Sequence, residues 1–485
     1  MNATDLIPEL LHLDVANVAD QLLGRIATAT WAKLTFEQRQ DVIAYGLRAV
    51  GAHIEERSLR ELTTDAELIE IEGVAYRRLR QPSSTEYFGM WGSYRIEEAL
   101  YRQAGMRNGP TIKPLEKRAG MVTKSMTPML ARTLGEMQAD MTSREAAKRL
   151  RRLGLGSGER AYVADHVHRL EVELADQVDE LEQAAREAEK LPEGVASISC
   201  GMDRRSIPME EDRPVEQPPK TDRRVRRRPY VRKKPGPIDV NYRMAYVGTV
   251  SLVDEDAQAI RTMRYTMEAD GDAQELAKRI RAEVEGLLGK RPSLPISIVQ
   301  DGAKELEVLR EELLGGAAAD TTVHDLVDYQ HLLGYLDAVV AACEPPDDPH
   351  NMKRLYRGKL LHEDRGIDHI FPALRRRARN IPNTSERSAE RKALARALSY
   401  IRDRRGRMRY AAARRANLFI GSGATESTCK LIGQRTNRSG ARWRPPGVRG
   451  TMAVRSLVLS ERWDHAWAHY ARSKLSTVTP LSLAQ

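Results

Sequence analysis

The stretch Ile296-Ser-Ile-Val-Gln-Asp301-Gly302 is a short apolar, β-branched run that ends on an aspartate. This pattern is typical of a buried strand that delivers a carboxylate at its end. A second stretch of the same kind, Val195-Ala-Ser-Ile-Ser-Cys-Gly-Met-Asp203, lies earlier in the chain. A third, Gly421-Ser-Gly-Ala-Thr-Glu426-Ser-Thr-Cys-Lys430, predicts instead a helix that opens with a glutamate. The three stretches therefore predict a site of two strand-borne aspartates and one helix-borne glutamate.

The carboxylates Asp203, Asp301 and Glu426 suit a pair of hard divalent cations. Such cations take oxygen ligands, and two of them can hold the attacking and the leaving oxygen of a phosphoryl displacement. Each residue taken singly also has a plainer interpretation. Asp-Gly is a common turn dipeptide, and a glutamate in the first turn of a helix favours the positive end of the helix dipole. The joint occurrence of the three favours the metal site.

The order of elements around these residues predicts the fold class. A first strand is predicted to end at Asp203, and further strands cover 241–252, 260–268, 296–300 and 322–327, with helices over 272–288 and from residue 305. This is the order of a ribonuclease-H-like domain, a mixed α/β sheet in which the first and fourth strands are neighbours. That adjacency would bring Asp203 and Asp301 together. We assign the catalytic domain to 194–328 and 416–465, interrupted by an Arg-rich helical insertion over 329–415.

The rest of the chain predicts a multidomain protein, since 485 residues are too many for one ordinary core. A helical segment covers 1–60, with a capping box at Thr35 and Gln38. A small β-rich module covers 64–120, broken by Gly73 and by Pro82. Residues 125–193 predict a helix-turn-helix-like region and a long coiled-coil-like helix, whose apolar stripe suits either its own domain or a dimerising coil. Residues 466–485 form a C-terminal tail.

The charge of the chain favours a polyanionic partner. The formal net charge is +10, and arginine is concentrated in 223–234, 353–379 and 387–415. The guanidinium fork matches phosphate oxygens bidentately, so Arg-rich faces fit phosphate better than they fit small acidic metabolites. The three cysteines are too few for a disulfide framework and too far apart for a zinc ribbon. No apolar run approaches 18 residues and the N-terminus lacks a signal-peptide pattern, so we expect a cytoplasmic protein without a membrane partner or an organic cofactor.

The region around Glu426 resembles a known family. The stretch 421–443 is similar to the C-terminal motif of bacterial insertion-sequence transposases of the Kra type, which belong to the DDE class and have a ribonuclease-H-like core. Asp301-Gly302 with its preceding strand is similar to their second acidic motif. Asp328-Tyr-Gln-His331 resembles an Asp-x-x-His element that many transposases of this class carry before the glutamate. The resemblance covers residues 125–465.

This resemblance implies metal-dependent cleavage of transposon-end DNA and strand transfer into target DNA. It implies that Asp203, Asp301 and Glu426 are catalytic and hold two Mg²⁺ or Mn²⁺ ions. Asp328 and His331 would be accessory residues. The partners would be terminal-repeat and target DNA, on which the chain would act as a homodimer or higher oligomer associated with the nucleoid.

The chain departs from the family pattern at the first aspartate and near the N-terminus. Relatives commonly follow the first aspartate with glycine, whereas here Arg204 and Arg205 follow it. Many relatives also carry a cysteine-rich zinc module, but the β-rich region 64–120 has no cysteine. Packing alone would therefore hold that module together.

A further group of residues is predicted to bind DNA. Glu426, Lys430, Gln434 and Arg438 recur at intervals of four, which places them on one helix face. A salt-bridged surface helix is the alternative. The Pro- and Arg-rich insertion over 212–237 is predicted to order on DNA, with a solvated linker as the alternative. The remaining predicted phosphate or base-stacking contacts are Arg435, Arg442, Trp443, Arg226, Arg227, Arg228, Lys233 and Lys234.

Functions of other classes use the same residues. A catalytically inactive or domesticated relative would bind DNA without cutting it. A structure-specific DNA nuclease of the same fold would cut without joining strands. Metal-dependent nicking of the element's terminal repeats separates the first from a transposase, and joining of precut ends to a target separates the second.

Overall fold

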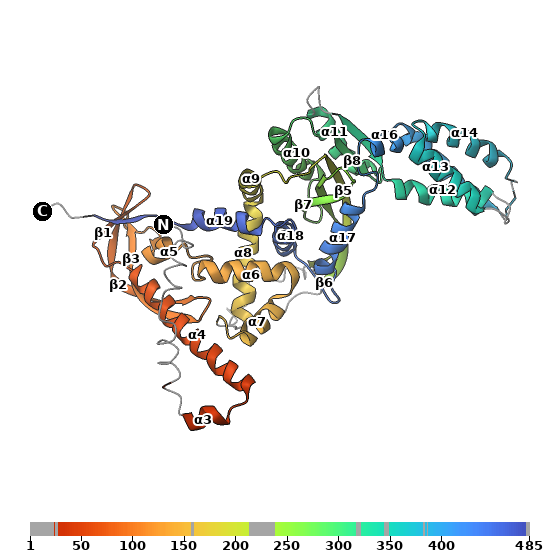
Figure 1. Cartoon of the computed structure of the whole chain (residues 1–485). Coiled ribbons are helices and arrows are strands. Elements are labelled where there is room, and N and C mark those ends of the chain that lie inside the picture. Colours follow the sequence, from red (N-terminus) through yellow and green to blue (C-terminus); the bar gives the residue numbers. More distant parts are fainter. Residues whose placement is uncertain are drawn as a thin grey trace, which may run out of the picture. The chain divides into compact units, whose positions relative to one another are not determined.

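The computed structural model describes Gly24 and residues 28–156, 160–212, 238–316, 322–343, 349–381, 384–385 and 387–481. The chain forms two compact units of different length, and each unit combines segments that are separate in the sequence (Figure 1). The first unit comprises Met1–Leu134, Thr142–Val167 and Ala471–Gln485, and the second comprises Gly135–Met141 and His168–Tyr470. The second unit contains Asp203, Asp301 and Glu426.

The first unit is built on a five-stranded sheet in the order β10-β1-β2-β3-β4. Its strands are β1 (Leu68–Ile71), β2 (Val74–Phe88), β3 (Ser93–Gln103), β4 (Thr111–Ile112) and β10 (Val478–Pro480). The prediction of a C-terminal tail is wrong for the residues that form β10, because they pair antiparallel with β1. Pro82 does not break a strand as predicted. It lies inside β2 at a register shift, where a missing N–H is tolerated.

Helices of the N-terminal half confirm some local predictions and correct others. They are α3 (Thr28–Lys33), α4 (Phe36–Glu61), α5 (Pro114–Arg118), α6 (Pro128–Asp140), α7 (Ser143–Arg152), α8 (Arg160–Asp176) and α9 (Val178–Ala188). The capping box of Thr35 and Gln38 opens α4 as predicted. The long helix predicted before residue 193 is interrupted at Gln177, between α8 and α9. Its apolar stripe, including Leu170 and Leu181, is buried, so the stripe packs within its own chain.

The second unit contains the predicted mixed sheet, in the order β7-β6-β5-β8-β9. Its strands are β5 (Ser197–Asp212), β6 (Ile238–Val253), β7 (Ala259–Met267), β8 (Ile296–Gln300) and β9 (Val323–Val327). The strands β5, β6 and β7 form an antiparallel meander, whereas β8 is parallel to both β5 and β9. The predicted adjacency of the first and fourth strands is thereby confirmed.

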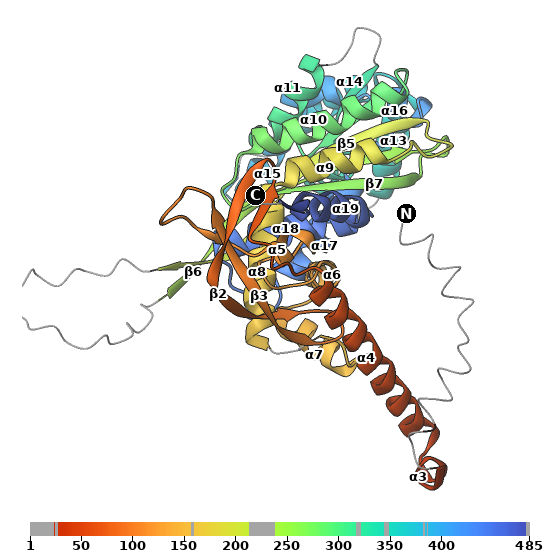
Figure 2. The same ribbon diagram turned by 90° about the vertical axis from the view of Figure 1, so that its left-hand side faces the viewer.

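The prediction that the first strand ends at Asp203 is wrong. Strand β5 continues to Asp212, because it pairs with β6 along its whole length, from Ser197 opposite Val253 to Asp212 opposite Ile238. The far end of this hairpin extends beyond the other strands of the sheet (Figure 2). Asp203 therefore lies inside a strand rather than at its end.

The two faces of this sheet have different cores. Ile198, Cys200 and Met202 of β5 pack against α10 (Ala273–Lys290) and α11 (Glu307–Gly316) on one face. On the other face, Ile207 of β5 packs with residues of α17 (Gly423–Thr436) and α18 (Pro445–Leu459). Because side chains alternate along a strand, the odd-numbered residues of β5 face α17.

The helical insertion follows β9 and has its own apolar core. It consists of α12 (Tyr329–Cys343), α13 (Pro349–His362), α14 (Gly366–Arg379), α15 (Ser388–Arg404) and α16 (Tyr410–Arg415). Short 3₁₀ turns cover Lys304–Leu306 and Arg405–Arg407. Figure 1 shows α12, α13 and α14 as a bundle that projects from the side of the sheet on which β8 and α16 lie.

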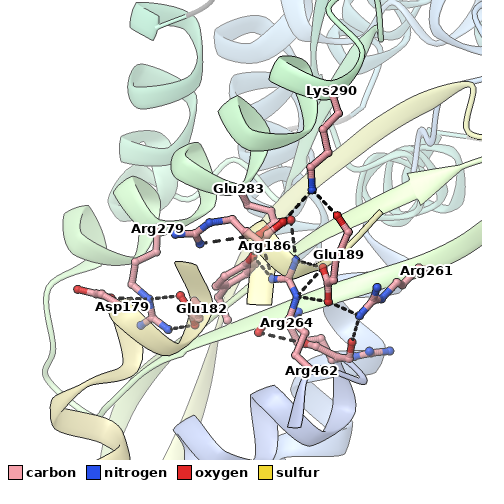
Figure 3. A network of polar contacts seen from close by, with 12 residues as sticks. Asp179, Glu182, Arg186, Glu189, Arg261, Arg264, Arg279, Glu283, Lys290 and Arg462 are labelled. Atoms are coloured by element: carbon pink, nitrogen blue, oxygen red, sulfur yellow. Dashed lines mark hydrogen bonds and ion pairs between the residues drawn. The ribbon is translucent and has the colours of Figure 1, made fainter. Parts of the chain in front are cut away.

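A buried ionic network joins α9, α10 and β7 to the junction between α18 and α19 (Trp463–Lys474), as Figure 3 shows. At its centre, Arg462 is 2% exposed and donates hydrogen bonds to Glu283, Glu189 and the hydroxyl of Tyr265. Burial opposes the charge of Arg462, but Tyr265, Glu283 and Glu189 raise its pKa above the ordinary value. The network therefore connects α9, α10 and β7 to the segment between α18 and α19.

Candidate functional site

Asp203 lies inside β5, and Asp301 directly follows the last residue of the neighbouring strand β8. Strands β5 and β8 pair in parallel, with Ile198 opposite Ile296 and Cys200 opposite Ile298. The paired register ends at Cys200 and Ile298, three residues before Asp203 and Asp301, and the negative charge of Asp301 raises the pKa of Asp203. Paired strands lie about 4.8 Å apart. The sheet thus brings together two residues that are far apart in the sequence.

The residues two positions before each aspartate lie on the same face of the sheet. Gly201, two residues before Asp203, faces α17, since a Cβ there would lie 2.3 Å from the hydroxyl of Thr425. Val299, two residues before Asp301, lies on the face opposite to Ile298, whose side chain belongs to the core with α10 and α11. Because residues two apart in a strand share a face, the carboxylate of Asp203 is directed toward the side that α17 covers. Asp301 follows the end of β8, where the chain turns at Gly302.

Helix α17 approaches this face closely because glycines line the contact. Besides Gly201 on the strand, Gly433 on the helix leaves room for the guanidinium of Arg205, which lies 2.6 Å from where a Cβ would be. The hydroxyls of Thr249 and Thr425 form a buried hydrogen bond of 2.7 Å between β6 and α17. These contacts hold the helix that carries Glu426 against the strand that carries Asp203.

The electrostatics of Asp203 reflect its carboxylate neighbours. Burial raises the pKa of Asp203, and the negative charges of Asp301 and Glu426 raise it further. Two donors act in the opposite direction: the backbone N–H of Arg204 at 2.7 Å and the thiol of Cys429 at 3.7 Å. The mutual repulsion of carboxylates is what a bound cation would relieve.

Three of the four residues predicted on one face of α17 lie within the helix and are exposed. Glu426, Lys430 and Gln434 are exposed, and Glu426 accepts a hydrogen bond of 3.1 Å from the hydroxyl of Ser422. Arg438 and Arg442 are also exposed, but α17 ends at Thr436, so both lie beyond it. The place of Arg438 on the helix face was therefore predicted wrongly, although both arginines are exposed.

Arg435 and Trp443 have structural contacts instead of a free surface. Arg435 is 6% exposed, and its guanidinium donates to the backbone carbonyl of Gln138 at 3.0 Å. The same guanidinium lies 5.0 Å from the ring centre of Trp443, whose indole N–H donates to the carbonyl of Thr436 at 2.7 Å. The burial of Arg435 contradicts its predicted phosphate contact. Trp443 is half-buried and one face of its ring is occupied.

Asp328 connects the end of β9 to the starts of two helices. It is 2% exposed, and one carboxylate oxygen accepts from the backbone N–H of His331 at 2.5 Å, which caps α12. The other oxygen accepts from the backbone N–H of Ser422, just before α17, at 2.5 Å. Asp328 therefore positions the start of the Glu426 helix, whereas the His331 side chain is exposed and contacts the rings of Tyr335 and Tyr400.

Some predicted contacts fall outside the described residues. They are Arg226, Arg227, Arg228, Lys233 and Lys234, all in the segment 213–237. Their predicted contact with DNA stays a prediction.

The donor set of the three carboxylates fits a hard divalent cation, because it consists of oxygen atoms whose charges repel one another. Within the described ranges, no group of three or more His, Cys, Asp or Glu side chains is arranged to hold a metal ion. Asp203, Asp301 and Glu426 are neighbours that do not form a finished ligand set. Their role as metal ligands stays a prediction.

Other side chains near Asp301 have no counterpart in the sequence analysis. Tyr400 and Arg404 of α15 donate hydrogen bonds to the backbone at Asp301 and Gly302. They come from a helix about a hundred residues further along the chain, and no local motif marks them. Only the tertiary structure identifies them.

Comparison with known proteins leaves the family open. No protein-family model matches the chain, and no curated protein matches it. A chain of the Drosophila P element transposase strand transfer complex is similar in structure, over 71% of this chain and 81% of that chain, at 12% sequence identity and a TM-score of 0.27. At that TM-score the similarity carries no argument, so the functional case rests on the strand order and on the parallel pairing of β5 with β8.

Among the described residues, no helix is both long and apolar enough to cross a membrane.

Proposed function

We propose that this chain is a DNA transposase of the DDE class, similar to the Kra-type insertion-sequence enzymes, with a ribonuclease-H-like catalytic domain. The observation that carries the proposal is the parallel pairing of β5, which contains Asp203, with β8, which Asp301 directly follows. The support from Glu426 is that its helix packs on β5 and β6, and that its charge, like that of Asp301, raises the pKa of Asp203. Two strand-borne aspartates with a helix-borne glutamate are an arrangement suited to phosphoryl transfer.

In this proposal Asp203, Asp301 and Glu426 hold Mg²⁺ or Mn²⁺, which when bound supplies charge stabilisation at the phosphoryl oxygens. The exposed Lys430 and Gln434 lie along the same helix face as Glu426 and contact the DNA backbone. Asp328 keeps the start of α17 in place through Ser422. The partners are the terminal repeats of the element and target DNA, on which the chain acts as a homodimer or higher oligomer.

The direct test is a nicking assay. A supercoiled plasmid that carries the DNA flanking the coding sequence is incubated with the full-length protein and Mg²⁺ or Mn²⁺. Cleavage that requires the metal, followed by joining of precut ends to a second plasmid, supports the transposase. Cleavage without joining supports a nuclease, and binding without cleavage supports a DNA-binding protein; both results contradict the proposal.

The exposed cations of the insertion lead to a prediction about DNA affinity. Arg391, Lys392 and Arg396 of α15 are exposed, and no ion pair joins them to a residue that the structure describes. Changing all three to alanine is expected to weaken binding to random and terminal-repeat DNA about equally, because phosphate contacts carry no base information. The slope of log affinity against log salt should become shallower by about 2 to 3, since each lost contact releases about 0.9 counterion fewer.

The matched control for that triple variant removes three exposed cations that are already paired. Arg57 and Arg60 pair with glutamates on α4, and Lys278 pairs with Glu275 on α10. Their change to alanine removes the same formal charge and should leave the salt slope nearly unchanged. Equal slopes for the two triple variants would show that α15 does not contact DNA.

A further inference from the structure

The last long helix of the insertion contacts the turn that presents Asp301. We refer to Asp301–Ala303 as the Asp301 turn. The hydroxyl of Tyr400 donates to the backbone carbonyl of Asp301 at 2.7 Å. The Nε and Nη2 atoms of Arg404 donate to the carbonyl of Gly302 at 3.1 and 2.6 Å. Tyr400 and Arg404 are four residues apart, so they lie on one face of α15.

The Asp301 turn has a backbone that depends on these contacts. Gly302 has φ +81°, in the left-handed region that favours glycine. A Cβ on Gly302 would lie 2.4 Å from Nε of Arg404, so the arginine occupies the space that a side chain would need. One carboxylate oxygen of Asp301 accepts from the N–H of Ala303 at 2.8 Å. The direction of the Asp301 carboxylate is therefore set by the conformation of the turn.

Aromatic packing holds Tyr400 in its donating position. Its ring is 9% exposed and stacks on Tyr335 of α12, with ring centres 4.1 Å apart and planes 24° apart. The guanidinium of Arg404 lies 4.6 Å from the centre of the Tyr400 ring. A cation on the ring face and a stacked ring restrict the rotamers of Tyr400.

The insertion contacts the neighbouring strand in the same way. The hydroxyl of Tyr410, on α16, donates to the carbonyl of Val327 at the end of β9 at 2.9 Å. Arg407 donates to Asp325 of β9 at 2.8 Å. The insertion thus binds the carboxyl ends of both parallel strands, β8 and β9, next to the site.

We propose that Tyr400 and Arg404 of α15 are positioning residues for Asp301. This inference rests on the proposed function, because Asp301 must be catalytic for its position to affect a rate. Tyr400 and Arg404 act through the backbone of the Asp301 turn and do not contact the substrate.

The test uses Tyr400→Phe in the full-length chain, which keeps the stacked ring and removes one hydroxyl. The kcat for Mg²⁺-dependent plasmid nicking is expected to fall about tenfold with KM for DNA unchanged, the size seen when a supporting hydrogen bond to a metal ligand is lost. In the protein without metal or DNA, hydrogen exchange at the Ala303 amide should become about fivefold faster, because one hydrogen bond no longer restrains the turn. Arg404→Met should change both measurements in the same direction.

The matched control is Tyr329→Phe, which removes the same atom from a ring that packs on Tyr410 in the insertion core. It should leave both measurements at the wild-type values. If Tyr400→Phe matches this control in exchange or in kcat, the positioning role is overturned. If the wild-type protein does not cleave DNA, the proposed function fails, and the exchange measurement alone still decides whether Tyr400 restrains the turn.

Discussion

Replacing Asp301 with asparagine is expected to lower the rate of metal-dependent DNA cleavage on the order of 10³-fold. The change keeps the size of the side chain and its ability to accept the hydrogen bond from Ala303. It removes a negative oxygen ligand, and metal stabilisation of phosphoryl charge is worth several kcal/mol, of which about 4 correspond to that factor. The measurement is the single-turnover nicking rate of the plasmid with Mg²⁺.

DNA affinity should be nearly unchanged by Asp301→Asn, because no phosphate contact is lost and one repulsive charge is removed. The control variant is Asp256→Asn, an equal change at an exposed carboxylate in the turn between β6 and β7. It should cleave at the wild-type rate. Cleavage by Asp301→Asn at the rate of this control would remove Asp301 from the catalytic site.

Replacing Glu283 with glutamine is expected to lower the free energy of unfolding of the second unit by about 3 to 5 kcal/mol. Glu283 and Arg462 are each 2% exposed and are joined by hydrogen bonds of 2.8 and 2.9 Å. Removing the charge of Glu283 leaves Glu189 as the remaining carboxylate partner of the buried Arg462 among the described residues, so the loss is expected at the lower end of this range. Urea denaturation followed by far-ultraviolet circular dichroism measures it.

A neighbouring pair on the same helix provides the control. Glu285 pairs with Arg281 at 2.7 Å, but both side chains are largely exposed, so Glu285→Gln should cost less than about 1 kcal/mol. The double variant Glu283→Leu with Arg462→Met should recover much of the stability lost in Glu283→Gln, since apolar packing can replace a buried pair. A loss for Glu283→Gln no larger than for Glu285→Gln would contradict a stabilising role of the network.

The same network has a consequence for acid stability. Burial alone would raise the pKa of Glu189, but Arg462 and Arg261 lower it below the ordinary value. A carboxyl group with a lowered folded-state pKa contributes stability above its unfolded pKa of about 4.3, and loses it as pH falls through the lower folded value. The contribution of Glu189 is therefore fully present at neutral pH and disappears only in acid.

The sequence was most informative where local pattern and tertiary structure agree. Strand β8 has the predicted bounds because a five-residue run with Ile296, Ile298 and Val299 is buried on both faces. The order of strands also predicted the parallel pairing of β5 with β8. The predicted end of β5 was wrong. The strand is extended by pairing with β6, which follows a segment of about 25 residues. Pairing across such a distance leaves no local signal in the sequence.

The burial of Arg435 could not be predicted from the spacing of residues along α17. The spacing of exposed residues on α17 gave no sign that Arg435 shares the buried side with Ile432 and Thr436. One acceptor of its hydrogen bonds, the carbonyl of Gln138, is 297 residues away in the sequence. Tyr400 was missed for a similar reason, since its partner is a backbone carbonyl and backbone acceptors are not encoded by residue type.

Hydrogen bonds at Asp328 and Tyr329 join the two ends of the insertion. The chain leaves the sheet at Tyr329, whose N–H donates to the carbonyl of Ile420 at 3.0 Å, and Asp328 accepts from Ser422. The segment that enters the insertion and the segment that leaves it are thus within hydrogen-bond distance of each other. The entropic cost of closing such a loop grows only slowly with its length, so its size can change over evolution at little cost to the sheet. The part of the insertion that cannot be lost is α15, because it donates hydrogen bonds to the backbone at Asp301 and Gly302. The rest of the insertion can change in length without affecting these contacts.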